Sequence, residues 1–460
     1  MFECMLTLAE TEIIVTGIDV VAVPNPALIW VWLVFMTVFG AIVGSFLNVV
    51  AYRLPEGKSV VSPPSSCPKC GHRLAWHDNV PVLGWIWLGG KCRYCKTKIS
   101  VQYPLIEAFC AFLFGGLFWV YYMSGMRPGF EALGFEGTWP VYVVHVLMLA
   151  GLLAATLIDF RLYIIPIQIP WVVTLFALVG LPLAVLLGLP SGRWLSELYM
   201  EGLQFERVPE FAYMMGGQIV PVGREAIWGA GIGGTIGLAV AMGLMWLKVI
   251  PRSFMDWEEQ LEKYEAEQAK LAKEKGGAAF KKDKLPGGGI GAEEIQEEIF
   301  MYPHPRREVL KELLFVMLPL VGVVVGWMMT RNQSGEAMFV SVTWYEVLVG
   351  VLFGYLVGGG LVWLIRIGGT LGFGKEAMGL GDVHLLGAIG AVLGAVDATL
   401  VFFVAPFLGI VAAMITIGVA SIAKGKVRVI PYGPYLAAAA VVVMVFRLEI
   451  LRFLDLAWQR

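Results

Sequence analysis

Charged residues are scarce in this 460-residue chain, where Asp, Glu, Lys and Arg together account for 15% of the residues. Hydrophobic residues account for 58%, and the mean hydropathy is +0.73, which excludes an ordinary water-soluble protein. The chain also lacks the alternating segments of about 10 residues that build membrane β-barrels. Its apolar runs instead approach the ~20 residues of a membrane-spanning helix. These features predict an all-α polytopic membrane protein.

The apolar runs predict about ten transmembrane helices. These helices would place the connecting segments alternately on the two sides of the membrane. When the long charged stretch is left out, the side that holds residues 52–103 has 14 Lys and Arg, and the opposite side has seven. Because basic residues are retained in the cytoplasm during insertion, residues 52–103 are expected there and both termini outside. The expected spans are 27–51, 104–124, 140–158, 169–189, 226–248, 312–330, 344–365, 383–398, 399–423 and 432–450.

The first 26 residues contain no Lys or Arg and therefore lack the basic region of a secretory signal. We expect the first helix to be retained after this acidic tail. The predicted parts of the chain are the outer tail 1–26, the first helix 27–51, a cytoplasmic domain 52–103, a membrane domain 104–189, an insertion 190–343 and a second membrane domain 344–460.

A charged arm at 251–311 is expected within the insertion, between two added spans. Residues 252–312 hold 25 of the 70 charged residues and are expected to lie in water as a solvated linker, with an interaction arm as the alternative. The preceding span, Trp228–Leu247, resembles Val347–Ile365 in its glycine spacing. Close helix packing or a partial duplication explains that likeness.

Cysteine is also scarce, but four of the six cysteines form two closely spaced pairs. Cys67 and Cys70 are separated by two residues, as are Cys92 and Cys95, and 21 residues lie between the pairs. Two such turns offer four thiolates to one tetrahedral ion, which predicts a structural zinc site. Two disulfides or a redox dithiol are the alternatives, although the expected cytoplasmic location disfavours stable disulfides.

Two aspartates are expected at the cytoplasmic edge of the bilayer. Asp159 ends the third apolar run, and Asp382 follows Gly379-Leu-Gly381 just before the eighth. Two carboxylates brought together there would share a proton, leaving one base to activate water and one acid to protonate an amide. This is the chemistry of aspartic proteases. Alone, each residue is equally explained as a helix-end charge facing headgroup water, and Asp382 also as a helix cap.

Several motifs, in order along the chain, resemble the type IV prepilin leader peptidase/N-methyltransferase family. The resemblance covers about residues 35–190 and 344–445 and leaves the acidic tail and most of 190–343 unmatched. Members usually have about eight spans, so this chain resembles a member with two added spans. The motifs are Gly44-Ser-Phe-Leu-Asn48, Arg53-Leu-Pro55, the two cysteine pairs, Trp76-His-Asp78-Asn79, Gln102-Tyr103-Pro104, Glu107, Gly374-Lys375-Glu376, Gly379-Leu-Gly381-Asp382 and Ile430-Pro-Tyr-Gly433-Pro434.

The resemblance implies an aspartic endopeptidase of the bacterial inner membrane, with Asp159 and Asp382 as its catalytic pair. Its substrates would be type IV prepilins or type II secretion pseudopilins, cleaved at the cytoplasmic face, and no nucleic-acid partner is expected. Many members also methylate the new N-terminus with S-adenosylmethionine, an activity associated with the cysteine domain. Glu107, Lys375 and Glu376 are the candidate substrate-binding residues, and the two glutamates are expected to attract the basic leader.

Two other functions remain open at this point. A presenilin-like intramembrane protease also uses Gly-x-Gly-Asp, but it would not supply the cysteine pairs. A zinc-stapled membrane scaffold is the non-enzymatic alternative, and it would tolerate replacement of either aspartate. A transporter is disfavoured because no predicted span carries a carboxylate at its middle.

Overall fold

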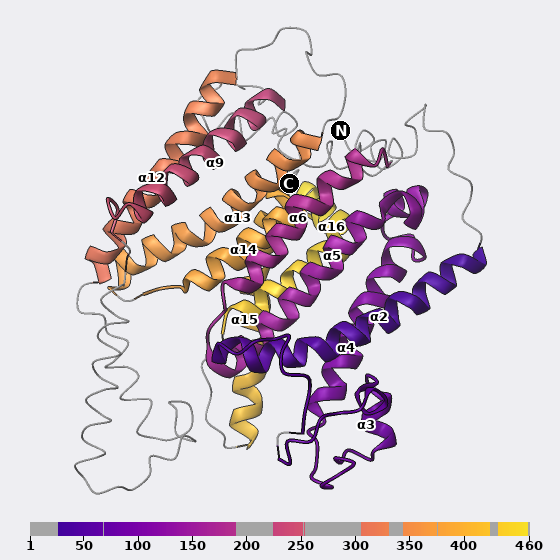
Figure 1. Cartoon of the computed structure of the whole chain (residues 1–460). Coiled ribbons are helices and arrows are strands. Elements are labelled where there is room, and N and C mark those ends of the chain that lie inside the picture. Colours follow the sequence, from indigo (N-terminus) through magenta and orange to yellow (C-terminus); the bar gives the residue numbers. More distant parts are fainter. Residues whose placement is uncertain are drawn as a thin grey trace, which may run out of the picture. The chain divides into compact units, whose positions relative to one another are not determined.

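The computed structural model describes residues 26–67, 69–189, 224–251, 253, 305–330, 344–374, 376–423 and 431–458. The N-terminal tail 1–25 and most of the predicted arm lie outside these residues. Within the described residues the regular secondary structure is helical (Figure 1), and the segment between the first two long helices consists mostly of turns with two isolated β-bridges. The long helices are α2 (Pro26–Arg53), α4 (Gln102–Tyr122), α5 (Pro128–Leu162), α6 (Gln168–Leu186), α9 (Arg224–Trp246), α12 (Pro305–Thr330), α13 (Trp344–Phe373), α14 (Leu380–Leu393), α15 (Ala395–Ala423) and α16 (Gly433–Trp458).

Each of these ten helices overlaps one of the ten predicted spans, so the predicted fold class is confirmed. In the described part of the chain, eight helices are long and apolar enough to cross a membrane, and two shorter apolar helices fall within α14 and α16. The predicted boundary between the eighth and ninth spans is wrong by a few residues, because Gly394, with φ +87°, ends α14 early. Asp397 therefore lies in the first turn of α15, where it accepts from Arg447 Nε at 2.9 Å.

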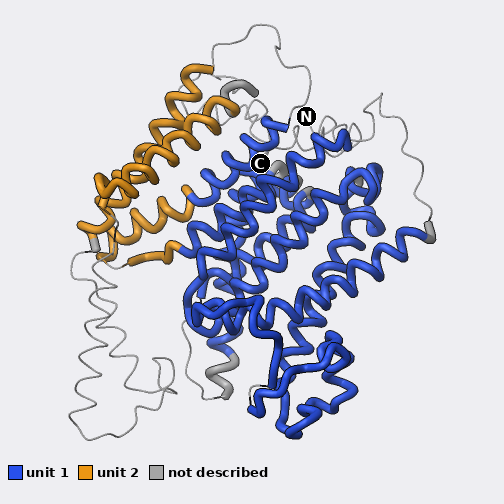
Figure 2. Tube along the Cα trace, viewed as in Figure 1, with its two compact units in different colours: residues 1–224, 334–359, 381–460 blue, residues 225–333, 360–380 orange. Residues whose placement is uncertain are grey.

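The chain divides into two compact units (Figure 2). The first contains residues 1–224, 334–359 and 381–460, and the second contains residues 225–333 and 360–380. The second unit thus combines the two helices of the expected insertion, α9 and α12, with the end of α13 and the segment after it. Both candidate catalytic aspartates belong to the first unit.

Close glycine contacts explain the resemblance between the two glycine-rich runs. In the second unit, Gly233 of α9 lies so close to the Gly322 backbone of α12 that no Cβ would fit. In the first unit, Gly354 of α13 meets Gly390 of α14 in the same way. Small residues let membrane helices approach backbone to backbone, so packing accounts for both runs without invoking a duplication.

Close packing of α2 on α4 also positions the cysteine-bearing segment, which connects these two helices. A Cβ on Gly44 of α2 would lie 2.8 Å from Glu107 Cα and 2.9 Å from Cys110 Cβ in α4. Asn48 Nδ2 donates to the Tyr103 carbonyl at 3.3 Å, next to the point where α4 begins. The segment also contains η1 (Leu54–Glu56), η2 (Trp76–Asn79) and the short helix α3 (Leu83–Trp87).

Candidate functional site

The four paired cysteines converge on one point. Their Sγ atoms all lie within 4.8 Å of one another, and Cys67 and Cys92 are buried while Cys70 and Cys95 are exposed. All four are free thiols. Four sulfurs in this arrangement match the donor set of a closed tetrahedral metal site. The predicted cluster is therefore present, and a metal has a place to bind.

The two cysteine turns are built alike, because each wraps backbone N–H groups around its first cysteine. Gly71 N donates to the Cys67 carbonyl at 2.9 Å, and Lys96 N donates to the Cys92 carbonyl at 3.0 Å. Gly71 and Lys96 both have positive φ, +68° and +56°, at the same position of the turn. Backbone N–H groups of Cys70 and Lys69 lower the pKa of Cys67 to about 6, so this turn favours a thiolate.

An ion pair between a buried aspartate and a half-exposed arginine joins the second cysteine turn to η2. Arg93 lies between Cys92 and Cys95, and its Nε and Nη2 donate to Asp78 Oδ1 at 2.8 and 2.6 Å. These hydrogen bonds hold the pKa of Asp78 below its ordinary value. A depressed folded-state pKa means that the pair stabilises the domain above the unfolded pKa of about 3.9 and is lost as the pH falls through the lower value.

Glu107, a predicted leader contact, is buried and connects the cysteine domain to α4. Its Oε2 accepts from the Val82 backbone N–H at 2.7 Å, immediately before α3. Ser45 of α2 also hydrogen-bonds to this carboxylate. These contacts give Glu107 a positioning role between α2, α4 and α3. Its predicted attraction for a basic leader stays a prediction.

Asp159 lies in the last turn of α5, and its side chain is buried. The helix ends when Tyr163 adopts a left-handed conformation and donates its N–H to the Asp159 carbonyl at 2.9 Å. The carboxylate meets the start of α16, where the Gly433 backbone hydrogen-bonds to it. A Cβ on Gly433 would lie 2.7 Å from Asp159 Oδ2.

Asp382 lies in the first turn of α14, and Ile165 links it to the surroundings of Asp159. A Cβ on Gly381, the residue before Asp382, would lie 2.7 Å from Ile165 Cβ. The Ile165 side chain also approaches Gly433, where a Cβ would lie 2.9 Å from Ile165 Cδ1. The Asp382 carboxylate acts electrostatically on the Tyr432 phenol, next to Gly433. The end of α5 and the starts of α14 and α16 therefore meet around Ile165 and Gly433.

The predicted peptidase activity should fall strongly in Gly433→Ala, because the added methyl would press on Asp159 Oδ2 and Ile165. We expect a loss of roughly 10²-fold, the scale on which small displacements of reacting groups act. The measurement is cleavage rate at saturating substrate, with membrane insertion verified. Gly418→Ala is the matched control, since nothing lies within 4 Å of a Cβ there. Equal rates for the two variants would show that Gly433 does not constrain Asp159.

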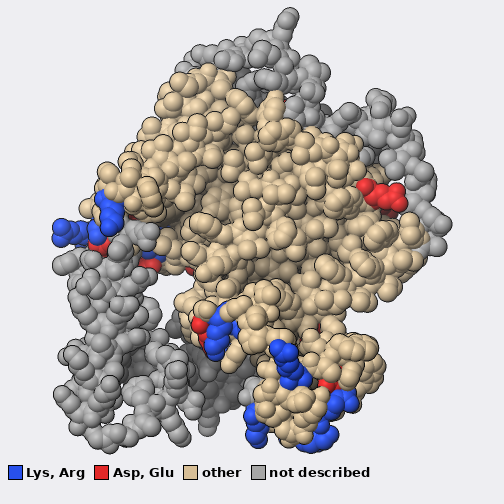
Figure 3. Space-filling view, viewed as in Figure 1, with Lys and Arg blue, Asp and Glu red and all other residues tan. Residues whose placement is uncertain are grey.

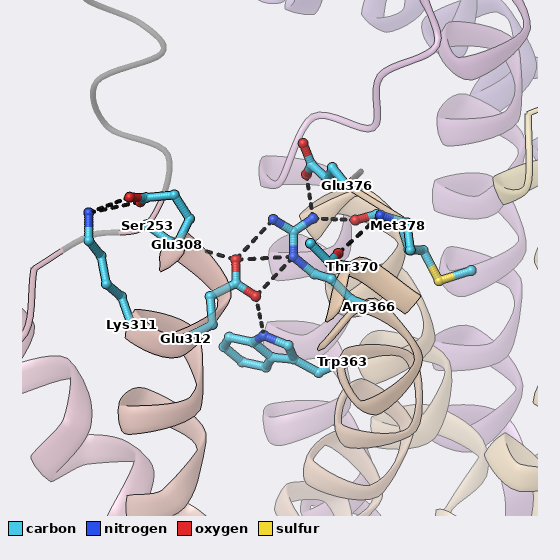
Figure 4. Close-up of polar contacts among 10 residues, drawn as sticks. Ser253, Glu308, Lys311, Glu312, Trp363, Arg366, Thr370, Glu376 and Met378 are labelled. Carbon is cyan, nitrogen blue, oxygen red and sulfur yellow. Dashed lines mark hydrogen bonds and ion pairs between the residues drawn. The ribbon is translucent and has the colours of Figure 1, made fainter. Parts of the chain in front are cut away.

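A second polar network, confined to the second unit, surrounds Arg366 near the end of α13 (Figure 4). Arg366 is 1% exposed and Glu312 of α12 is 3% exposed. Arg366 Nη2 donates to Glu312 Oε1 at 2.9 Å, and Trp363 Nε1 donates to Glu312 Oε2 at 3.0 Å. Arg366 Nη1 also donates to Glu376 Oε1 and to the Met378 carbonyl. The network therefore joins α12, the end of α13 and the segment that follows α13 within the second unit.

This network corrects the expectation that residues 252–312 lie entirely in water. Helix α12 begins at Pro305, within the predicted arm, and Glu308 and Glu312 are buried. Glu308 pairs with Lys311 at 2.7 Å, and Glu312 pairs with Arg366. Charge density alone does not distinguish these two glutamates from the other acidic residues of the stretch, because the partner of Glu308 comes from its own helix and the partner of Glu312 from a distant helix.

Arg366→Met is expected to destabilise the protein by about 3–5 kcal/mol, because it leaves the Glu312 carboxylate buried without its cation. The double variant Arg366→Met with Glu312→Gln should recover much of that loss. Thermal unfolding in detergent provides the measurement, and Lys248→Met is the control in the same unit, because Lys248 is exposed. Additive losses in the double variant would show that the pair is not coupled.

Glu376 and Lys375 are the other two predicted substrate-binding residues. The Glu376 side chain is half-exposed and shares the Arg366 guanidinium with Glu312. Lys375 lies outside the described residues. Sequence reasoning missed Arg366 and Glu312 as partners, although an arginine inside the apolar run Leu361–Ile367 was a visible anomaly. It also assigned no role to Ile165 or Gly433.

These observations define a polytopic helical membrane protein with a four-cysteine domain between its first two long helices and two carboxylates near Ile165 and Gly433. Residues 38–121 match the family described as Bacterial Peptidase A24 N-terminal domain. The chain is 39% identical over 163 residues to a prepilin leader peptidase/N-methyltransferase of Myxococcus xanthus, covering 35% of this chain and 42% of the relative. It is 36% identical over 176 residues to the protein of that name from Pectobacterium carotovorum, covering 32% and 57%.

A protein of the same name from Vibrio cholerae is 43% identical over 86 residues, covering 17% of this chain and 34% of the relative. These similarities confirm the resemblance expected from the motifs. The chain spans about half the length of the first two relatives. No solved structure matches.

Proposed function

We propose that this chain is a prepilin peptidase that removes the short basic leader of type IV prepilins or type II secretion pseudopilins. It would act at the cytoplasmic face of a bacterial inner membrane, with both chain termini outside. The proposal rests on one observation: the segments that contain Asp159 and Asp382 meet around Ile165 and Gly433. The name shared by the relatives supplies the substrate class.

In the proposed mechanism, Asp159 and Asp382 share one proton. The ionised carboxylate takes a proton from water as the water oxygen attacks the carbonyl carbon of the scissile peptide bond. The protonated carboxyl group then donates to the amide nitrogen, so the carbon–nitrogen bond breaks and the new amine leaves. Burial of Asp159 and its contact with the start of α16 keep this carboxylate fixed.

The cysteine domain would hold one zinc ion through Cys67, Cys70, Cys92 and Cys95. The donor set fits, because four sulfurs within 4.8 Å of one another leave no ligand position for water in a tetrahedral site. Zinc bound there supplies a structural cross-link between two turns that are 21 residues apart. It would be structural and would take no part in peptide cleavage.

The relatives' name also supports a second activity, methylation of the newly exposed N-terminus. S-adenosylmethionine would be the methyl donor and a second substrate. The leader's basic residues would be attracted by acidic groups near the site, and Glu376 suits this role better than Glu107, because half of its side chain is exposed.

Co-expression with a candidate prepilin tests the proposed function. The product should lack its leader, as measured by N-terminal sequencing and intact mass, and an added methyl mass would establish the second activity. A precursor of unchanged mass, obtained with protein that is inserted in the membrane, would overturn the proposal. Cleavage without the methyl mass would restrict the chain to peptidase activity.

A further inference from the structure

The short helix α3 presents an apolar face to its surroundings. Leu83, Ile86 and Trp87 stand at positions i, i+3 and i+4, so they share one side of the helix. They are 49%, 57% and 70% exposed. Trp85 points the other way, since its Nε1 donates to the Ile99 carbonyl at 3.2 Å. The fold of the cysteine domain therefore leaves the Leu83, Ile86 and Trp87 face uncovered.

A contact between the start of α3 and the long apolar helix α4 indicates what covers this face. The Val82 N–H, immediately before α3, donates to Glu107 in the second turn of α4 at 2.7 Å. Helix α4 is one of the helices long and apolar enough to span a bilayer. Helix α3 therefore starts beside the N-terminal end of a helix that can span a bilayer, and the ends of such helices are the depth that Trp side chains prefer.

The rest of the cysteine domain is basic. Residues 52–103 contain eight Lys and Arg against two Asp and Glu. Four thiolates and one zinc ion together would carry a charge of about −2, which still leaves the domain with a net positive charge. The two acidic residues are already paired, Glu56 with Lys58 and Asp78 with Arg93. Figure 3 shows blue Lys and Arg atoms gathered over this domain. The exposed basic residues without a recorded ion pair within the described residues are Lys69, Arg73, Lys91, Lys96 and Lys98.

We propose that the Leu83, Ile86 and Trp87 face of α3, together with these basic residues, docks the cysteine domain on the anionic surface of the bilayer. Amphipathic helices bind membranes through two interactions: apolar side chains are buried at the interface, and basic side chains are attracted to the phosphate headgroups. The basic leader of the proposed substrate does not suit this surface, because like charges repel. An anionic phospholipid satisfies both the apolar and the basic parts.

Photo-crosslinking of the full-length chain tests this docking. The benzophenone amino acid p-benzoylphenylalanine replaces Trp87 in one variant and Val61 in the other, and the protein is placed in nanodiscs with about 30% phosphatidylglycerol. Val61 is the matched control, since it is 83% exposed in the same domain. After irradiation, intact mass identifies the adduct. A phospholipid adduct at position 87, in clear excess over position 61, is the expected result.

A charge reversal then tests the basic part of the surface. Lys91→Glu with Lys98→Glu changes two residues that face each other across a β-bridge. This pair of substitutions should lower the phospholipid adduct at position 87 by about threefold in anionic nanodiscs and leave it unchanged in uncharged ones. Lys58→Gln, at a residue already paired with Glu56, should change it little. Retained zinc binding verifies that each variant folds.

Three outcomes would overturn the docking proposal. Equal lipid adducts at positions 87 and 61 would mean that α3 has no preferred contact with the bilayer. An adduct with a second copy of the chain would make the face an interface between copies. An adduct with added prepilin in place of lipid would make it a substrate surface. Cleavage activity decides none of these results, so failure here is distinguishable from failure of the proposed peptidase function.

Discussion

Asp382→Asn is expected to abolish leader cleavage while the protein still inserts in the membrane. A neutral amide can neither share the proton of the pair nor activate water, so the rate should fall by roughly 10³-fold or more, equivalent to about 4 kcal/mol of transition-state stabilisation. Asp159→Asn should cause a loss of the same order. The measurement is cleavage of a purified prepilin in detergent, with each variant at equal concentration.

The double variant distinguishes a catalytic pair from two independent residues. Members of a catalytic unit are not additive, so Asp159→Asn with Asp382→Asn should be no slower than either single variant. Asp397→Asn is the matched control, because Asp397 is buried in the same unit but pairs with Arg447. We expect it to lower thermal stability and leave cleavage largely intact.

Other results would favour the other functions. Wild-type cleavage by either Asp→Asn variant would remove that residue from the proposed pair. Full cellular function in both variants would support the zinc-stapled scaffold. Cleavage within the membrane-embedded part of a substrate, in place of cleavage after the leader, would support a presenilin-like protease.

Cys67→Ser should release the metal and unfold the cysteine domain. Structural zinc sites contribute about 10–16 kcal/mol of apparent binding free energy in small peptides, and that energy is folding energy. Elemental analysis of the purified protein should therefore change from one zinc per chain to almost none. Protease sensitivity within residues 52–103 should rise together with the loss of metal.

Cys110→Ala is the control for the removal of a thiol. Cys110 is buried in α4 against Gly44, away from the four-cysteine cluster, so this variant should keep its zinc. A wild-type chain that contains no metal, together with a disulfide within each cysteine pair, would contradict the zinc assignment. Zinc that persists in Cys67→Ser would show that three ligands suffice and that the site is not of the closed four-thiolate kind.

The sequence by itself determined the membrane helices and the cysteine cluster. Both depend on information local to the chain: a run of apolar residues is long enough to cross a bilayer whatever its neighbours, and a two-residue spacing brings two sulfurs to one side of a tight turn. The exact ends of helices were less accessible. The break at Gly394 depends on a positive φ, and several neighbouring glycines offer the same freedom.

Only the tertiary structure decided which distant groups meet. Glycine contacts bring the start of α16 against Asp159, and Ile165 joins that point to Gly381, next to Asp382, although the end of α5 lies more than 200 residues before the other two segments. Burial of Glu107 and the Arg366–Glu312 pair likewise depend on helices that are distant in the chain. Hydropathy and spacing report each residue's own preference, whereas the partner that makes a buried charge tolerable is supplied by packing.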